Sequence, residues 1–147
     1  MKENKVIIEK LNSLLADYQI YYQNLRGFHW NIQGKEFFEL HVKFEELYTD
    51  ASVKVDEIAE RILTVGGTPL HSFEDYLATA HIKPVKNVHE GEISVKTVVS
   101  NLEQIITQEK ELKEIAGDAH DSGTEDQMSA LIEEQEKTLW MYKAWLK

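Results

Sequence analysis

Residues 36–65 read EFFELHVKFEELYTDASVKVDEIAERILTV and contain neither glycine nor proline. Apolar side chains recur in this stretch every three or four residues, which is the period of one face of an α-helix. They are Phe37, Leu40, Phe44, Leu47, Ala51, Val55, Ile58, Ile62 and Leu63. Gly66 and Gly67 follow directly, and glycine is common just past the end of a helix. The stretch therefore predicts one unbroken amphipathic helix.

Three further segments show the same apolar period. They run from about Lys5 to Asn31, from Ser94 to near Gly117 or Gly123, and from Thr124 to the C-terminus. Gln127 follows Thr124 by three residues, a capping-box pattern that marks a helix start. We find no segment with the period of two that is typical of a strand. Four long amphipathic helices predict an all-α protein built as a four-helix bundle.

The connections between these helices differ in length. The first and last are short, which predicts two antiparallel hairpins, whereas the middle connection, residues 66–93, is long. Ser72 precedes Asp75 in a second capping-box pattern, so we expect a short extra helix over about residues 73–80. The last long helix reaches the end of the chain, so no fifth C-terminal helix is expected. Residues 1–147 are expected to form a single domain.

Composition narrows the classes of function. The chain has 16 Lys and Arg against 26 Asp and Glu, a formal charge of −10, which favours cations over nucleic acid or anionic membranes as partners. It has no cysteine, which excludes disulfides, thiolate metal sites and cysteine nucleophiles. No apolar run is long enough for a transmembrane helix. We therefore expect a soluble, cytoplasmic protein.

Five side chains are candidate metal ligands. His41 and Glu45 are four residues apart, as are Asp56 and Glu60, so each pair can present two ligands on one helix face. At about 100° per residue, all four lie on the same side of their helix. His29, near the end of the first helix, can join the side of His41.

Within one chain, the His41–Glu45 pair and the Asp56–Glu60 pair are too far apart to bind the same metal. Along an unbroken helix, His41 and Asp56 are roughly 22 Å apart, whereas metal–ligand bonds are about 2 Å long. Two copies remove this difficulty if their helices cross antiparallel near residue 50, because each pair then faces the other pair of the second copy. A two-fold contact of this kind creates two identical sites.

The residues leave alternatives open at this point. Imidazole and carboxylate ligands without thiolate suit Fe(II), Zn(II) or Mn(II). No histidine has Glu three positions before it, which disfavours a di-iron site inside one bundle. Exposed acid pairs at this spacing are also typical of a solvated helix face, and histidines at helix ends are often packing residues. In that alternative the chain is a structural helical oligomer.

Several motifs together resemble the Dps (DNA-protection-during-starvation) mini-ferritins of the ferritin-like superfamily. They are His29-Trp30-Asn31, Phe37-Phe38-Glu39-Leu40-His41, Asp56-Glu57-Ile58-Ala59-Glu60-Arg61-Ile62-Leu63, Gly66-Gly67-Thr68-Pro69 and Leu139-Trp140-Met141. The resemblance covers essentially the whole chain. It implies a ferritin-like bundle with one long crossover, assembled as a hollow shell of twelve subunits.

The resemblance also implies an activity. Such proteins are ferroxidases that oxidise Fe(II), preferably with hydrogen peroxide, and store ferric mineral inside the shell, which protects against oxidative damage. The resemblance implies iron sites at two-fold interfaces, with His29 and His41 from one subunit and Asp56 and Glu60 from its partner. Asp56 is the expected bridging or central carboxylate. Iron is thus the implied metal.

Further residues acquire roles through the same resemblance. The family commonly has Asp four residues after the second histidine, and Glu45 here keeps the charge and adds one methylene group. Trp30 is expected near the site, or packed at a subunit contact. Asp121 and Asp126 are candidates for an acidic iron-entry pore at the three-fold axis; alternatively, acids at this junction complement the dipole of the last helix.

The family name also suggests a second function, DNA compaction by a nucleoid protein with weak iron chemistry. Family members that bind DNA usually do so through a mobile, lysine-rich tail. Only residues 1–4 precede the first helix here, and the formal charge of twelve copies repels phosphate. DNA binding is therefore not expected.

Overall fold

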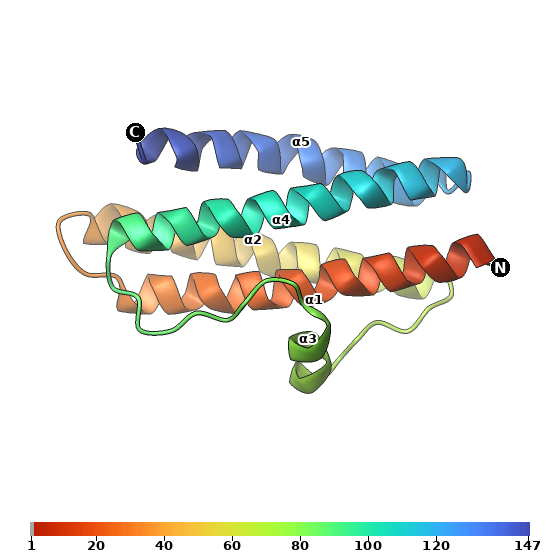
Figure 1. Cartoon of the computed structure of the whole chain (residues 1–147), viewed down its shortest axis with the longest axis horizontal. Helices are drawn as coiled ribbons and strands as arrows, with labels where there is room; N and C mark the ends of the chain where they lie inside the picture. The colour runs from red at the N-terminus through yellow and green to blue at the C-terminus, as the bar shows by residue number, and fades with distance from the viewer. Residues whose placement is uncertain (1) are drawn as a thin grey trace.

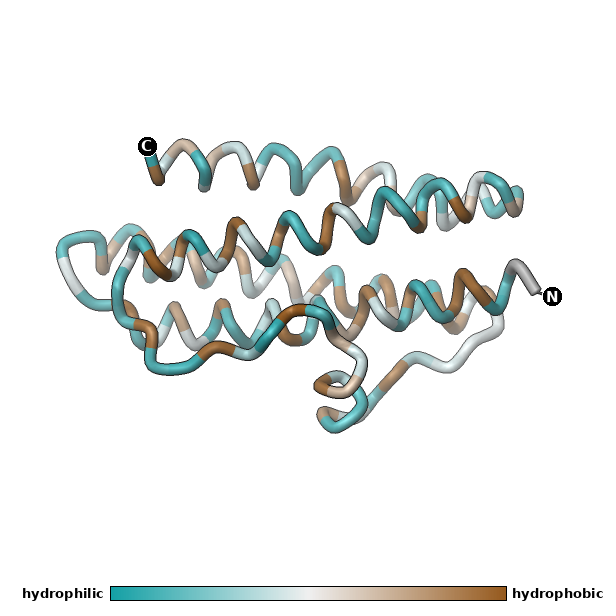
Figure 2. Tube along the Cα trace, in the orientation of Figure 1, coloured by the Kyte–Doolittle hydropathy of each residue, from teal (hydrophilic) through white to brown (hydrophobic). Residues whose placement is uncertain are grey.

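The structure, a computed structural model, describes residues 2–147 and contains, in that part of the chain, five helices and no strand. The helices are α1 (Lys2–Asn31), α2 (Phe37–Thr64), α3 (Phe73–Thr79), α4 (Gly91–Asp118) and α5 (Ser122–Trp145). Figure 2 shows hydrophobic and hydrophilic residues interspersed along each long helix. Each long helix therefore has apolar side chains to bury and polar ones to leave in water.

The four long helices pack as two hairpins (Figure 1). α1 packs along α2, α4 packs along α5, and α1 also contacts α4. The core between them consists of large side chains that are almost completely buried, among them Leu11, Leu14, Tyr18, Leu25, Phe44, Ile58, Ile62, Leu102 and Ile105. Burial of these side chains is the main force that holds the bundle together. Of the helices in residues 2–147, none is long and apolar enough to cross a membrane.

The expectation of no fifth C-terminal helix is wrong. The crossover forms a helix of its own, α3, whose start is stabilised because Ser72 Oγ accepts the N–H of Asp75 at 3.2 Å. The C-terminal helix, α5, is consequently the fifth. It begins at Ser122, earlier than Thr124, because the Asp121 carboxylate caps it by accepting the N–H of Thr124 at 3.1 Å. The fold thus has four long helices and one short one.

The crossover is tied to α1 by a buried carboxylate. Asp17 Oδ1 accepts the backbone N–H groups of His81 at 2.6 Å and of Ile82 at 2.7 Å. Further along, the backbone N–H of Gln33 donates to the carbonyl of His89 at 2.9 Å. The crossover therefore reaches the turn between α1 and α2, and it holds that turn in place.

The turn itself brings two histidines to the same end of the bundle. Gly34 has a φ of +108°, a backbone conformation that glycine adopts without strain. The chain reverses there between the last residue of α1, Asn31, and the first of α2, Phe37. His29, two residues before the turn, and His41, four residues into α2, consequently face each other.

Candidate metal site

The ring of each of the two histidines, His29 and His41, binds the backbone carbonyl of the other. His29 Nδ1 lies 2.6 Å from the carbonyl oxygen of His41, and His41 Nδ1 lies 2.7 Å from the carbonyl oxygen of His29. The rings are stacked, with centroids 3.8 Å apart and planes only 10° from parallel. Two residues from different helices are thereby fixed in one arrangement.

These contacts decide which ring nitrogens can bind a metal. A carbonyl oxygen can only accept, so Nδ1 of each histidine carries the proton and donates it. In neutral histidine, Nε2 then has a lone pair. Histidines that bind metals commonly donate the other ring N–H to a backbone carbonyl in this way. In both rings, Nε2 is therefore the nitrogen that can bind a metal.

Glu45 extends this pair by one carboxylate. Its Oε1 lies 3.6 Å from His29 Nε2, which is too long for a hydrogen bond. The two groups attract each other as an ion pair only if His29 is protonated; with Nε2 unprotonated, a cation between them would hold them together. Donors that bind the same metal at about 2.1 Å are roughly 3 to 3.4 Å apart, close to the observed spacing. His29 and His41, with Glu45 beside His29, are thus the candidates for one half of a metal site.

Asp56 and Glu60 lie elsewhere on α2. Both are exposed, and no hydrogen bond or ion pair of either carboxylate occurs among the described residues. The helix between His41 and Asp56 is continuous, so the separation of roughly 22 Å holds. Within residues 2–147 of one chain, no group of three or more histidines and acids is close enough to hold a metal.

The face of α2 that carries Asp56 and Glu60 also exposes hydrophobic side chains. Its exposed hydrophobic side chains are Phe38, Val42, Val53 and Leu63, each more than half exposed. Between them lie the small side chains of Thr49 and Ser52, beside a shallow depression lined in part by Glu45. Covering this face with another protein would remove four hydrophobic side chains from water.

Aromatic side chains surround the histidine pair. Tyr48 meets the His29 ring edge-on at 5.3 Å, and it also packs against Tyr22 at 6.0 Å. Trp30 is 55% exposed, and the guanidinium of Arg26 lies over its ring at 4.8 Å. Trp30 therefore lies next to the site in sequence but faces solvent, and its role stays a prediction.

The two candidate pore residues differ in their surroundings. Asp121 accepts hydrogen bonds from the Thr124 hydroxyl at 2.6 Å and from Arg61 at 2.8 Å. Partial burial raises the pKa of Asp121, but the bonds from Thr124 and the charge of Arg61 outweigh it and lower the pKa overall. Asp121 thus caps α5 and pairs with α2, whereas Asp126 is exposed. Their role in a pore stays a prediction.

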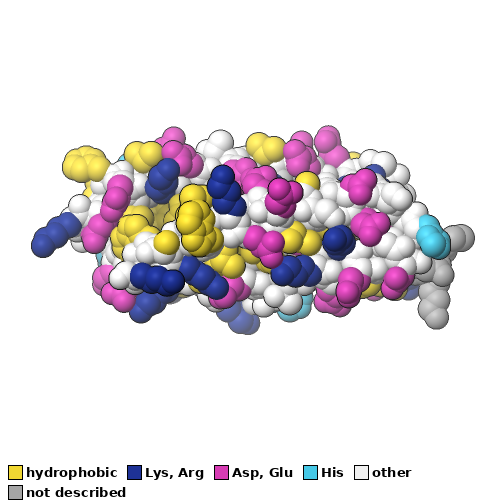
Figure 3. Space-filling model, turned by 90° about the horizontal axis from the view of Figure 1, so that it is seen from above, with side chains coloured by type: hydrophobic (Ala, Val, Ile, Leu, Met, Phe, Trp, Pro, Cys, Tyr) yellow, Lys and Arg dark blue, Asp and Glu magenta, His cyan; other side chains and the backbone are white. Residues whose placement is uncertain are grey.

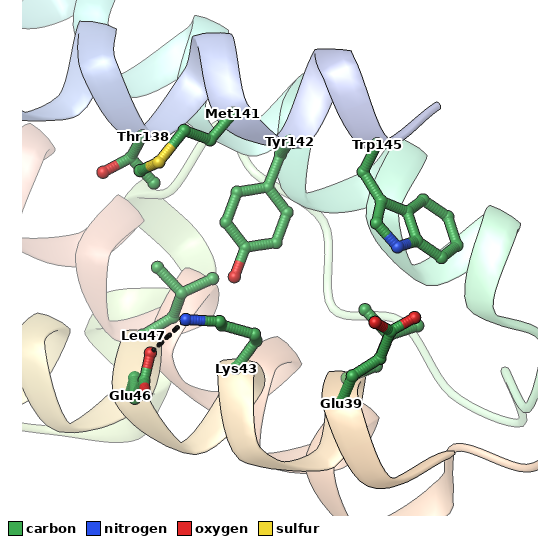
Figure 4. A pocket seen from close by; sticks show the side chains of 9 residues that line it. Glu39, Lys43, Glu46, Leu47, Thr138, Met141, Tyr142 and Trp145 are labelled. Atoms are coloured by element: carbon green, nitrogen blue, oxygen red, sulfur yellow. Dashed lines mark hydrogen bonds and ion pairs between the residues drawn. The ribbon is translucent and has the colours of Figure 1, made fainter. Parts of the chain in front are cut away.

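A separate pocket of about 310 Å³ lies between α2 and α5. Figure 4 shows Tyr142 and Trp145 pointing into it from α5, opposite Glu39 and Lys43 of α2. Figure 3 shows hydrophobic side chains gathered on this face toward the end that holds the C-terminus. Lys43 is roughly 160° around α2 from His41, so the pocket is not part of the candidate metal site.

Sequence reasoning missed a polar cluster inside the bundle. The hydroxyl of Tyr18 donates to Glu109 Oε2 at 2.6 Å, and the amide nitrogen of Gln135, in the orientation that satisfies its neighbours, donates to Oε1 at 2.5 Å. Lys54 is 4% exposed, and its ammonium group donates to Glu134 at 2.8 Å. The signal available in the sequence was a charged or polar residue at a position that the helical period assigns to the core.

Comparison with known proteins gives concordant matches. A family model described as a ferritin-like domain matches residues 8–147. A Porphyromonas gingivalis protein named DNA protection during starvation protein is 44% identical over 147 residues, covering 99% of this chain and 92% of that protein. The crystal structure of a Dps protein from Vibrio cholerae O1, described as one of the ferritin-like diiron-carboxylate proteins, has a TM-score of 0.98 and 49% identity, covering 99% of this chain and 92% of that chain. A Dps crystal structure from Bacillus brevis has a TM-score of 0.97 and 35% identity, covering 100% and 99%.

Proposed function

Since the chain belongs to the Dps mini-ferritin family of ferritin-like proteins, we propose that it is a ferroxidase that oxidises Fe(II) and stores the ferric product. The observation that carries the proposal is the His29–His41 pair. Both Nδ1 atoms are bound to backbone carbonyls, and both Nε2 atoms are left for a cation, with the Glu45 carboxylate 3.6 Å from one of them. Iron is the substrate of the proposed reaction.

The complete site is proposed to form between two copies. His41 and Glu60 are symmetric about a point between residues 50 and 51, and so are Glu45 and Asp56. Two α2 helices that cross antiparallel at this point therefore bring each histidine pair to the acids of the other copy. The side chains nearest the crossing on the outer face are the small Thr49 and Ser52, which allow a close approach. Burial of the exposed apolar side chains of this face would stabilise the contact.

The ligand set suits the proposed chemistry. Neutral imidazole nitrogens bind Fe(II), and carboxylate oxygens stabilise the higher charge of Fe(III). Asp56 of the second copy is the proposed central carboxylate, and Glu60 the second acid ligand. Glu45, with its longer side chain, is proposed to bind the second iron position directly or through water.

We propose hydrogen peroxide as the preferred oxidant. Two Fe(II) ions each give one electron to one peroxide molecule, which takes up two protons and leaves as two water molecules. Peroxide is thereby consumed as a two-electron oxidant, and no hydroxyl radical is released. The Fe(III) formed is proposed to collect as mineral inside a hollow shell of twelve copies. A cytoplasmic location stays a prediction that cell fractionation would check.

Protection of DNA by coating it is the weaker candidate. The relative from Porphyromonas gingivalis is named for DNA protection. The formal charge of this chain is −10, and like charges oppose contact with phosphates. We therefore propose that any protection comes from the removal of Fe(II) and peroxide.

The proposal is tested by loading the assembled metal-free protein with Fe(II) without oxygen and then adding hydrogen peroxide. Ferric absorbance and peroxide loss are followed together, and the iron that elutes with the protein is measured afterwards. Oxidation well above the rate in buffer, with the iron retained, supports the proposal. A rate equal to that in buffer refutes it and favours the structural helical oligomer.

A further inference from the structure

Phe37, the first residue of α2, stacks on His41. Their ring centroids are 4.8 Å apart, and their planes are 17° from parallel. His41 stacks in turn on His29, so three rings form one continuous stack from the start of α2 to the end of α1. Phe37 has no atom that can bind a metal, yet it is in direct contact with a candidate ligand.

The two histidines are not held equally well. His29 is 7% exposed, and Tyr48 packs edge-on against it. His41 is only half-buried, and its aromatic contacts among the described residues are His29 and Phe37. Because two parallel rings cannot occupy the same face, Phe37 covers the face of His41 that is opposite His29.

The stack restricts a motion that the hydrogen bond alone allows. The second side-chain torsion of histidine is broad, so a ring held only by its Nδ1–H can tilt about that bond. A tilt of His41 would move its Nε2 away from the metal position. Rings packed on both faces oppose the tilt, and one aromatic pair is worth a few-fold to about tenfold in an equilibrium constant.

We propose that Phe37 is a positioning residue, a role that rests on the ferroxidase function proposed above. It keeps the His41 ring in the plane in which Nδ1 reaches the His29 carbonyl and Nε2 is presented to the metal. The residue acts through His41 and does not touch the iron.

Two substitutions separate the ring from the bulk of the side chain. Phe37→Leu keeps an apolar side chain but removes the stack. Phe37→Tyr keeps the ring, and its added hydroxyl can reach water because the position is half-buried. Both variants are first checked for unchanged assembly by size-exclusion chromatography, and His41→Ala identifies the signals of His41.

The first readout needs no metal. Solid-state NMR of protein labelled with ¹⁵N-histidine reports which ring nitrogen of His41 is protonated. The wild type and Phe37→Tyr should show a single form with the proton on Nδ1, and Phe37→Leu should show a second population. The second readout is Co(II) binding, followed by its visible absorbance. Affinity in Phe37→Leu should be about three- to tenfold lower, and in Phe37→Tyr nearly unchanged.

Two results overturn the proposal. One is a Phe37→Leu protein with the His41 signals and Co(II) affinity of the wild type. The other is an equal loss in Phe37→Leu and Phe37→Tyr, which would mean that the ring stack is not what matters. If the NMR and Co(II) results follow expectation but the wild type oxidises Fe(II) no faster than buffer, only the ferroxidase proposal fails.

Discussion

The hydroxyl of Tyr18 donates a 2.6 Å hydrogen bond to Oε2 of Glu109, and both side chains are completely buried between α1 and α4. Burial raises the pKa of Glu109 to about 8 from its usual 4.5, although the Tyr18 bond and the charge of Lys54 act in the opposite direction. The folded chain therefore binds a proton at this site that the unfolded chain releases at lower pH.

This proton makes the free energy of unfolding depend on pH. Between pH 4.5 and about 8 the folded protein holds one more proton than the unfolded protein, so the free energy of unfolding falls as pH rises. The slope from this one group is at most about 1.4 kcal/mol per pH unit. Glu109→Gln should remove that slope and become more stable than the wild type near pH 9. Denaturant unfolding from pH 5 to 9 measures it, with exposed Glu114→Gln as the control that should keep the slope.

Asp56→Ala should leave the fold intact and abolish rapid Fe(II) oxidation. The Asp56 side chain is exposed and makes no hydrogen bond or ion pair within residues 2–147, whereas the proposed site loses its central carboxylate. The rate should fall by at least the 10- to 100-fold that is typical of losing even an outer partner of a metal site. Glu57→Ala is the matched control, because Glu57 is equally exposed but points about 100° away. Equal rates in the two variants would remove Asp56 from the site.

Mixed assemblies test whether the site is shared between copies. Neither His41→Ala nor Asp56→Ala should be active alone. When the two are refolded together, half of the pairs are mixed, and each mixed pair has one intact site and one site that lacks both residues. About one quarter of the wild-type activity should therefore return. A site contained in one chain predicts no recovery at all.

Asp17→Ala should be the most damaging substitution of an acidic residue. Its buried carboxylate accepts the N–H groups of His81 and Ile82 and the side-chain amide of Gln108 at 2.5 Å. Removing it leaves these donors without their acceptor, at a cost of roughly 3 to 5 kcal/mol in the free energy of unfolding. Chemical denaturation measures the loss, and limited proteolysis should cut the crossover. Exposed Glu74→Ala should be close to neutral, and a similar loss in both would contradict the anchoring role.

The protein should not retain plasmid DNA in a gel-shift assay at neutral pH and physiological salt. With 26 acidic and 16 basic side chains, its average field repels phosphate. A control protein with a lysine-rich peptide attached to its N-terminus should shift the plasmid. Retention of DNA by the unmodified protein would restore DNA compaction as a function.

Most of the fold could be predicted from the helical spacing of apolar residues in the sequence. The helix expected over residues 36–65 is found at Phe37–Thr64, and the short helix expected over 73–80 at Phe73–Thr79. Both have local signals, an unbroken apolar stripe in one case and the Ser72 cap in the other. The expectation of no fifth C-terminal helix was wrong, because the helix at the C-terminus, α5, is the fifth in chain order once α3 is counted.

The start of α5 shows where local signals fail. Thr124 with Gln127 reads as a capping box, but Gln127 donates to the backbone of Glu57 on α2 at 3.4 Å. The cap is Asp121, which Arg61 also binds from α2. The capping bond is local, and Asp is a common cap residue. The pairing with Arg61 depends on how the hairpins pack, and no local pattern reports it.

The candidate site was only partly visible in the sequence for a similar reason. Spacing identified His41 with Glu45 and Asp56 with Glu60 as pairs on one helix side. The bonds that orient the histidines are made to backbone carbonyls, which every residue has, so composition does not reveal them. The contribution of Phe37 also depends on ring orientation, which the sequence does not specify.

Because α2 is one continuous helix, it fixes the distance between the two ligand pairs of the proposed iron site. His41 and Glu45 lie near one end and Asp56 and Glu60 near the other, and the helix alone sets the separation and relative direction of these two pairs. A single residue inserted between His41 and Asp56 would lengthen the helix by only about 1.5 Å but turn one pair by about 100° relative to the other. Side chains along this span can thus vary far more readily than their number.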